Sequence, residues 1–340
     1  MEVCGIKFAP LNVPLRRRLQ TLAASAWFLI IYYGFIICSI LAVYLIFYTS
    51  FKWIVVPYLL WVWFVDKTVA VTGGRRSHLV RSSSWWGYLK AYFPMTFHVL
   101  PGAKLDPKKN YLFSCFPHGI APAGAFTFLV SDHSGFKESF PHHIPHVVTL
   151  GLLYSFPFVR EFLLAIGGVP STEAAIEDVL GKPGGGNVCG LFVGGIAEAF
   201  YCKPGVHRLK LKTRKGFVRL ALKNGASLVP VYSFGETELF DQPNSAMARN
   251  INEIGYKWLG FPPLMLSGRG FFQYSFGILP RRHPVSVVVG EPIDVPKIEQ
   301  PTREQVDEYH SKFVDKLIQL FEEQKFKYLE KPDGAKLIID

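Results

Sequence analysis

The sequence contains few cysteines and no pattern that would pair them. A chain of 340 residues holds five, with no short paired spacing and one left over: Cys4, Cys38, Cys115, Cys189 and Cys202. Neither a disulfide framework nor a cysteine-based metal site is indicated. The sequence also has no Asn-x-Ser/Thr sequon and no Gly-x-Ser-x-Gly motif. The first absence fits a body that faces the cytosol, and the second counts against a hydrolase of the nucleophile-elbow type.

Negative charge is in deficit, and there is neither an internal repeat nor a low-complexity tract. The chain has 37 Lys and Arg residues against 26 Asp and Glu, for a formal net charge of +11 at pH 7. This excess favours anionic partners, which are phospholipid headgroups, the phosphates of CoA, or nucleic acid. Nucleic acid fits worst, because no segment resembles a nucleic-acid-binding module. The sequence does not report an oligomeric state and leaves a homo-oligomer open.

Charge is absent from a long stretch near the N-terminus. Residues 22–48 contain no charged side chain, and as a helix they would span roughly 40 Å, more than the ~30 Å core of a bilayer. Residues 53–65 are apolar again but short for an independent span. A single span and a hairpin turning near Gly34 or at residues 49–52 both fit. Arginines and lysines flank the stretch on both sides, at 16–18, 67, 75, 76 and 81. This favours the hairpin, with both flanks in the cytosol.

The rest of the chain alternates strand and helix patterns. We predict a cytosolic segment (1–21), a membrane helix or hairpin (22–65), a basic connector (66–84) and an α/β domain (85–340). Within that domain we expect strands at 111–115, 188–193, 227–234 and 285–289, and helices at 171–179, capped by Ser171, at 215–223 and after the capping box at 302–305. The predicted fold class is α/β, a mainly parallel sheet flanked by helices, with an N-terminal membrane-embedded helical hairpin.

The first strand runs into Phe116-Pro117-His118-Gly119. Parallel sheets place their sites in loops at the carboxyl ends of strands. There His118 could act as a general base, with nearby backbone N–H groups steadying an oxyanion. A histidine in a tight turn with no chemical role is the alternative on this segment alone.

A second strand ends in Gly194-Gly195-Ile196-Ala197-Glu198. The glycine pair allows a sharp turn and brings Glu198 to the same edge of the sheet, where it could orient the imidazole or hold an acceptor hydroxyl. The alternative is a carboxylate that merely favours a helix N-terminus.

Basic residues at 208, 210, 212 and 214 alternate with less polar ones ahead of Lys215-Gly216-Phe217. Read as a strand, this segment has one cationic face that suits the phosphates of CoA. The alternative is a solvated edge strand that its lysines protect from aggregation.

These segments together closely resemble the type-2 diacylglycerol acyltransferase family, which includes monoacylglycerol and wax-alcohol acyltransferases. The resemblance covers nearly the whole chain. Besides the motifs above it includes Tyr92-Phe93-Pro94, Arg160-Glu161 ahead of Gly167, Val229-Pro230-Val231, Phe234-Gly235-Glu236, Gly268-Arg269-Gly270 and Val289-Gly290-Glu291-Pro292-Ile293. Several ordered motifs at family-like spacing are more specific than any one of them.

The resemblance implies an endoplasmic-reticulum enzyme with a membrane hairpin, both ends cytosolic, that also resides on lipid droplets. It implies transfer of an acyl group from acyl-CoA, the co-substrate, to an acylglycerol, with no metal, no other cofactor and no covalent acyl-enzyme. We expect catalytic residues His118 and Glu198. Expected substrate-binding residues are Phe116, Pro117, Gly119, Glu161, Gly194, Gly195, Arg208, Lys210, Arg214, Lys215, Gly216 and Phe217.

The chain departs from the family pattern at one position. Family members usually carry His-Pro-His-Gly, whereas here the first histidine is replaced by Phe116. An aromatic ring transfers no proton, so the chain would be inactive if the first histidine were the essential base; we expect the base to be His118. The wider glycerolipid acyltransferases pair histidine with an aspartate five residues later, a position held here by Ala123. Glu198 is the candidate replacement, and Glu161 is the second choice.

The acceptor is less well defined. We expect diacylglycerol, with monoacylglycerol as the alternative and a wax alcohol still open. A different class of reading is a catalytically disabled lipid-droplet or lipid-binding protein on the same scaffold.

Overall fold

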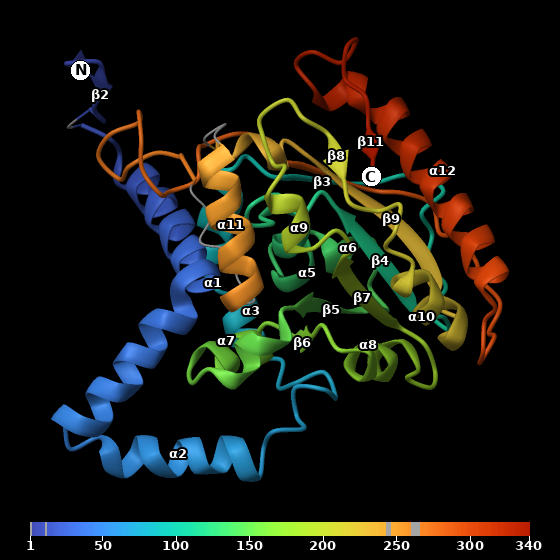
Figure 1. The fold of residues 1–340 in the computed structure, drawn as a ribbon, viewed down its shortest axis with the longest axis horizontal. Coiled ribbons are helices and arrows are strands. Elements are labelled where there is room, and N and C mark those ends of the chain that lie inside the picture. Colours follow the sequence, from blue (N-terminus) through green and yellow to red (C-terminus); the bar gives the residue numbers. More distant parts are fainter. Residues whose placement is uncertain (1, 11, 243–245, 260–265) are drawn as a thin grey trace.

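A seven-stranded sheet forms the centre of the protein (Figure 1). The computed structural model describes residues 2–10, 12–242, 246–259 and 266–340. The strands lie in the order β3 (Thr96–Val99), β10 (Ser286–Val289), β9 (Ser227–Phe234), β4 (Tyr111–Phe116), β7 (Asn187–Phe192), β5 (Ile144–Thr149) and β6 (Gly168–Pro170). Each neighbouring pair is parallel except β9 with β10, which is antiparallel. The predicted, mainly parallel sheet is confirmed.

Helices cover both faces of this sheet. One face packs against α1 (Leu15–Tyr48), α4 (Ser84–Tyr92), α5 (Gly124–Val130), α6 (Phe136–Ser139) and α7 (Val159–Ala165); the other packs against α8 (Glu173–Leu180), α10 (Gly216–Asn224) and α12 (Arg303–Tyr328). The remaining helices are short or lie outside these layers: α2 (Lys52–Phe64), α3 (His78–Arg81), η1 (Gly151–Ser155), α9 (Ile196–Ala199), η2 (Glu236–Glu238) and α11 (Ala246–Leu259). Each face therefore has its own hydrophobic core, because the side chains of β4, β7 and β9 alternate between them.

Most predicted element boundaries agree with the structure to within a few residues. The predicted capping box is confirmed: the Thr302 hydroxyl accepts from the N–H of Gln305, whose side chain accepts from the N–H of Thr302. The predicted cap of α8 is wrong by one position, since Thr172 and not Ser171 accepts from the N–H of Ala175. The predicted cationic strand is far shorter than expected: only β8 (Arg208–Leu209) forms, paired in parallel with β11 (Ile338–Ile339).

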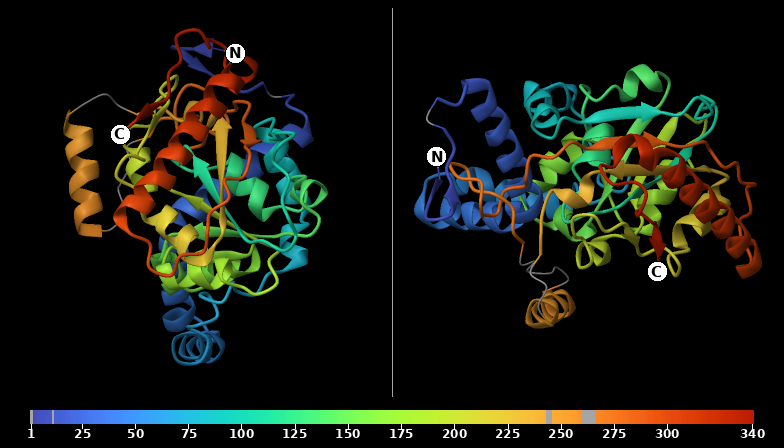
Figure 2. Two further views of the ribbon diagram at one scale, coloured as in Figure 1. Left: turned by 90° about the vertical axis from the view of Figure 1, so that its right-hand side faces the viewer. Right: turned by 90° about the horizontal axis from the view of Figure 1, so that it is seen from above.

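The apolar N-terminal region divides into two parts. The first half of α1 lies against the body, where buried small and aromatic residues such as Ala23, Ala24 and Phe28 pack near α4. The second half of α1 and all of α2 project from the body (Figures 1 and 2) and expose apolar side chains. α1 passes through Gly34 without a break, and the chain turns at residues 49–51 before α2. One helix, Leu15–Tyr48, is long and apolar enough to cross a bilayer.

Arginines join the connector after α2 firmly to the body. Arg160 of α7 donates to the Asp66 carboxylate at 2.5 Å, and both side chains are almost fully buried. Arg81 donates to the carbonyls of Ile166 and Leu129 and to Asp132, and it is 2% exposed. Buried guanidinium groups with satisfied donors fix the chain locally. The connector is therefore an integral part of the fold and not a loose tether.

Candidate active site at the carboxyl edge of the sheet

Three adjacent parallel strands deliver polar side chains to one edge of the sheet. β4 leads to His118, its neighbour β7 leads to Glu198 in α9, and its other neighbour β9 leads to Glu236 in η2. The loops beyond the carboxyl ends of parallel strands meet at such an edge. The predicted convergence of His118 and Glu198 is present in the structure, with a second carboxyl beside it.

The His118 ring is half-buried and held in one orientation. Its Nδ1 lies 3.0 Å from the carbonyl oxygen of Gly119, and its ring contacts Phe192 edge-on at 5.8 Å between centroids. Since a carbonyl only accepts, this contact places the imidazole proton on Nδ1 and leaves Nε2 as an acceptor. Burial lowers the pKa of His118 below its ordinary value. The neutral form that a general base requires is therefore favoured near pH 7.

Glu198 joins this loop to the basic segment through its two oxygens. One accepts from the backbone N–H of His118 at 2.7 Å, and the other accepts from the backbone N–H of Lys210 at 3.0 Å. Glu198 is 2% exposed, and burial raises its pKa to about 7 although the two N–H groups oppose the shift. The carboxyl contacts the histidine backbone and no contact with the imidazole is recorded. Glu198 therefore positions the loop that carries His118. Because the backbone N–H of His118 already donates to Glu198, it is unavailable to an oxyanion.

The glycine pair before Glu198 has a steric role. A Cβ on Gly194 would lie 1.9 Å from the Glu198 carboxyl carbon, so only glycine leaves room for this side chain. Gly195 has φ +58°, in the left-handed region where glycine is favoured. The two residues therefore allow the strand to turn and Glu198 to fold back beneath the loop.

Glu236 belongs to the site although its role was not predicted. Its two oxygens accept from the backbone N–H groups of Ala123 and Gly124 at 2.6 and 2.9 Å, at the start of α5. It is 2% exposed, and burial raises its pKa to about 7. The available signal was the motif Phe234-Gly235-Glu236 directly after a strand neighbouring β4. The carboxyl reaches the position where a local acidic partner of His118 was sought.

Two aromatic residues from the predicted set point into the core. Phe116 is 0% exposed and packs against Phe313 of α12 at 6.1 Å between centroids. Phe217 is 4% exposed and packs against the same ring at 5.0 Å. Because side chains alternate along a strand, Phe116 faces the layer of α10 and α12. Pro117 follows it through a cis peptide bond.

Three of the four predicted basic residues already have ion-pair partners in the structure. Arg208 and Lys210 both pair with Asp340 of the strand β11 extension, and both cations lie over the ring of Tyr201. Lys215 pairs with Asp307 at 2.6 Å, just before Gly216 begins α10. Arg214 is exposed, and its charge acts to lower the pKa of Glu198.

Glu161 lies in a separate cluster near the membrane helices. Its carboxylate pairs with Arg160 at 2.6 Å and with Arg75 at 2.9 Å, and it accepts from the Tyr58 hydroxyl of α2. The structure records no contact between Glu161 and the loop of His118. Within the described ranges, no group of three or more His, Cys, Asp or Glu side chains could hold a metal ion.

The sequence comparisons agree on one family of relatives. The family model described as diacylglycerol acyltransferase matches residues 44–340. Diacylglycerol O-acyltransferase 2 of Dictyostelium discoideum is 40% identical over 97% of this chain and 98% of its own length. 2-Acylglycerol O-acyltransferase 1 of Bos taurus is 42% identical over 95% of this chain and 96% of its own. Among solved structures, the 1-acyl-sn-glycerophosphate acyltransferase PlsC of Thermotoga maritima covers 90% of this chain and 97% of its own, with 14% identity and a TM-score of 0.40.

Proposed function

This chain belongs to the diacylglycerol acyltransferase family, and on that premise we propose that it transfers a fatty acyl group from acyl-CoA to diacylglycerol and so makes triacylglycerol. The observation that carries the proposal is the edge where β4, β7 and β9 end, with a neutral, oriented imidazole above two buried carboxyls. Acyl transfer to a hydroxyl needs a base of this kind.

In the proposed reaction, Nε2 of His118 takes the proton of the acceptor hydroxyl as its oxygen attacks the thioester carbonyl. A carbon–oxygen bond forms, the carbon–sulfur bond then breaks, and the imidazolium returns its proton to the leaving CoA thiolate. Two buried cysteines are poor candidates for a covalent acyl-enzyme, because burial raises the pKa of Cys189 and Cys202 to about 12. Such thiols form little thiolate near neutral pH. No acyl-enzyme, metal or further cofactor is part of the proposal.

Glu198 and Glu236 act on this step through the backbone. Glu198 holds the N–H of His118, and Glu236 holds the start of α5 that follows the histidine loop. We assign both as positioning residues. The proposed contacts for the phosphates of CoA are Arg208, Lys210, Arg214 and Lys215. The phosphates would compete with Asp340 for Arg208 and Lys210.

Residence in the endoplasmic-reticulum membrane, with both ends cytosolic and with access to lipid droplets, completes the proposal. It is supported by α1, which is long and apolar enough to cross a bilayer, and by the exposed apolar surface of α2.

A 2-monoacylglycerol acceptor is the second candidate, because the Bos taurus relative is as similar to this chain as the Dictyostelium one. Membranes containing the full chain should be incubated with labelled acyl-CoA and, in parallel, with diacylglycerol, 2-monoacylglycerol or a long-chain alcohol. Labelled triacylglycerol as the main product supports the proposal, and labelled diacylglycerol supports the second candidate. No labelled ester with any acceptor rejects both and favours the disabled scaffold.

The same assay tests the base. His118→Ala should lower turnover by at least about 100-fold. His78→Ala is the matched control, because the side chain of His78 is 86% exposed and lies on α3. Unchanged turnover in His118→Ala would refute the assignment of His118.

A further inference from the structure

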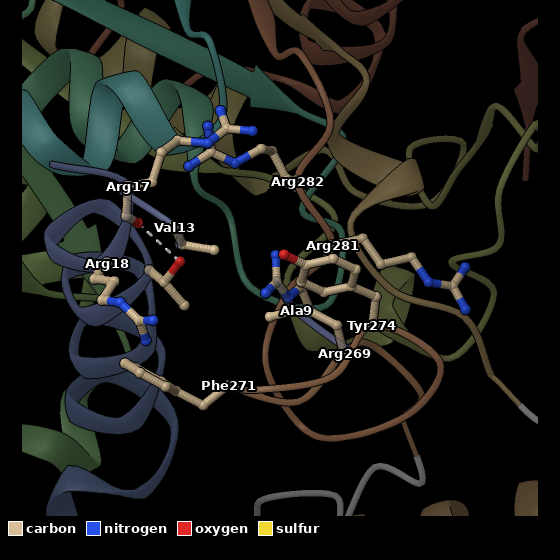
Figure 3. A pocket seen from close by; sticks show the side chains of 10 residues that line it. Ala9, Val13, Arg17, Arg18, Arg269, Phe271, Tyr274, Arg281 and Arg282 are labelled. Carbon is tan, nitrogen blue, oxygen red and sulfur yellow. Dashed lines mark hydrogen bonds between the residues drawn. The ribbon is translucent and has the colours of Figure 1, made fainter. Parts of the chain in front are cut away.

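A cavity of about 320 Å³ lies at the N-terminal end of α1, outside the edge described above. Five of its ten lining residues are arginines: Arg17, Arg18, Arg269, Arg281 and Arg282, with Ala9, Val13, Thr21, Phe271 and Tyr274 completing the wall. Figure 3 shows the side chains of Arg17 and Arg282 close together at one side, with Arg269 and Tyr274 opposite them. We call this cavity the arginine pocket.

The arginine pocket joins segments that are more than 200 positions apart in the sequence. Arg17 and Arg18 come from the first turn of α1, and Arg269 comes from the motif Gly268-Arg269-Gly270. Backbone hydrogen bonds join the stretches beside these segments: the N–H of Ala9 donates to the carbonyl of Phe272 at 2.8 Å, and the N–H of Tyr274 donates to the carbonyl of Lys7 at 2.8 Å. Arg282 in turn donates to the side chain of Gln20 in α1. The convergence is therefore part of the fold.

Four of the five arginines of the arginine pocket have no acidic partner within the described part of the chain. There, Arg17, Arg269, Arg281 and Arg282 form no ion pair with a carboxylate, whereas many other arginines do. Arg282 donates to the Gln20 side chain at 2.5 Å and lies over the ring of Tyr92, and Arg269 lies over the ring of Tyr274 at 4.3 Å. Neutral partners orient these guanidiniums and leave their charge uncompensated.

Neighbouring charge and burial act together on Arg282. Burial and the repulsion from Arg17 and Arg269 lower its pKa to about 10. The N-terminus of α1 adds to the positive potential, because its first turn has no acidic residue and Pro14 supplies no side-chain cap. Like charges held together at a cavity are the arrangement that an anion stabilises on binding.

We propose that the arginine pocket binds a phosphate group of a ligand, with Arg17, Arg269 and Arg282 as the main contacts. Guanidinium groups match phosphate oxygens in pairs, and several of them suit a group with two or more negative charges. The phosphate has two chemical sources: the headgroup of an anionic phospholipid, or a soluble phosphate ester. Arg17 precedes the charge-free stretch by about one helical turn, which is compatible with headgroup depth.

The test measures binding and not turnover, so its outcome is independent of the proposed acyl transfer. The full chain in phosphatidylcholine nanodiscs is titrated with 3′,5′-ADP, and separately the chain is titrated with vesicles that contain phosphatidic acid or phosphatidylcholine alone. Arg17→Gln combined with Arg269→Gln should weaken binding of the preferred probe by about 100-fold, since each charge-assisted contact is worth about tenfold. Arg16→Gln is the matched control: Arg16 is exposed, adjacent to Arg17, and does not line the cavity.

Each outcome of this test either supports or overturns the proposal. Binding of 3′,5′-ADP that the double variant loses supports a soluble phosphate ester. Preference for phosphatidic acid that the double variant loses supports a lipid headgroup. The proposal is overturned if neither probe binds, if the double variant binds the preferred probe as tightly as the wild type, or if Arg16→Gln loses as much affinity as the double variant. If the double variant does not fold, Arg17→Gln alone takes its place, because it alters only an exposed side chain. It should weaken binding of the preferred probe by about tenfold.

Discussion

The edge of the sheet and the arginine pocket both gather ionisable groups, but they treat charge in opposite ways. At the edge, Glu198 and Glu236 are buried and each accepts two backbone N–H groups of the same chain. In the arginine pocket, Arg17, Arg269 and Arg282 point into a cavity and have only neutral partners among the described residues. The first arrangement is complete without a ligand, and the second is not.

This difference separates structural charge from charge available for binding. A buried carboxyl with satisfied acceptors holds loops in place, and its removal leaves N–H groups unpaired. A cluster of like charges instead costs free energy until an anion arrives. Removing one charge should therefore lower the stability of the fold at the edge of the sheet and raise it at the arginine pocket.

Within this comparison of the two regions, the largest expected effect comes from displacing Glu198. In Gly194→Ala the new Cβ would overlap the Glu198 carboxyl, so the His118 loop should shift. We expect turnover to fall by about 100-fold, as a displacement of ~1 Å at reacting groups does. Gly87→Ala is the control, because a Cβ there meets nothing within 4 Å inside α4. Full turnover in Gly194→Ala would show that Glu198 does not position the loop.

Restoring the family histidine should next cost stability. In Phe116→His a polar ring would replace a fully buried one that packs on Phe313. We expect unfolding to become easier by about 2 to 3 kcal/mol, measured by denaturation in detergent. Phe272→His, at a side chain that is 65% exposed, should cost little. Higher turnover without loss of stability would mean that position 116 reaches the site.

The buried carboxyls predict a pH dependence of stability. The pKa of Glu236 rises from an ordinary value of 4.5 to about 7. Its contribution is therefore full below pH 4.5 and is lost as the pH rises through 7. Glu236→Gln cannot titrate, so its melting temperature should change less between pH 5 and pH 8, by a few degrees. Exposed Glu138→Gln should follow the wild type. Identical pH profiles for all three proteins would mean that burial does not shift the pKa of the Glu236 carboxyl.

The smallest effect should have the opposite sign. Without phosphate, Arg17→Gln removes one charge from the arginine pocket and should raise the melting temperature by about 1 to 2 °C at low salt. The gain should vanish at high salt, where repulsion is screened. Arg16→Gln, which does not line the cavity, is the control. A lower melting temperature in Arg17→Gln would mean that the charge of Arg17 stabilises the fold, as the carboxyls at the edge of the sheet do.

Short sequence patterns predicted the helices and strands whose ends are set by neighbouring residues in the chain. β9 is a continuous apolar run with the predicted bounds 227–234, and α12 begins at a capping box that the sequence spells out. β5 was not assigned, because Pro145 and His146 interrupt its apolar pattern and only its place between β7 and β6 makes it a strand. The cationic strand was predicted too long, since alternation alone does not supply the pairing partner that limits β8 to two residues.

The site was predictable where strand ends determine position. His118 and Glu198 both follow strands, so their shared edge followed from the parallel sheet. The carboxyl of Glu236 contacts residues more than 100 positions away, and the arginine pocket combines positions 17 and 282. Such contacts depend on how layers pack. A motif directly after a strand can point to a residue such as Glu236, but no periodicity or motif spacing reports its distant partners.

The buried pair between Arg160 and Asp66 has a consequence for the whole molecule. Asp66 directly follows the exposed apolar helix α2, and Arg160 belongs to the layer beneath the sheet. A helix joined to the body in this way cannot swing relative to it without breaking a buried ion pair. On the proposed residence in a membrane, the height of the histidine loop above the bilayer is then set by the architecture of the chain.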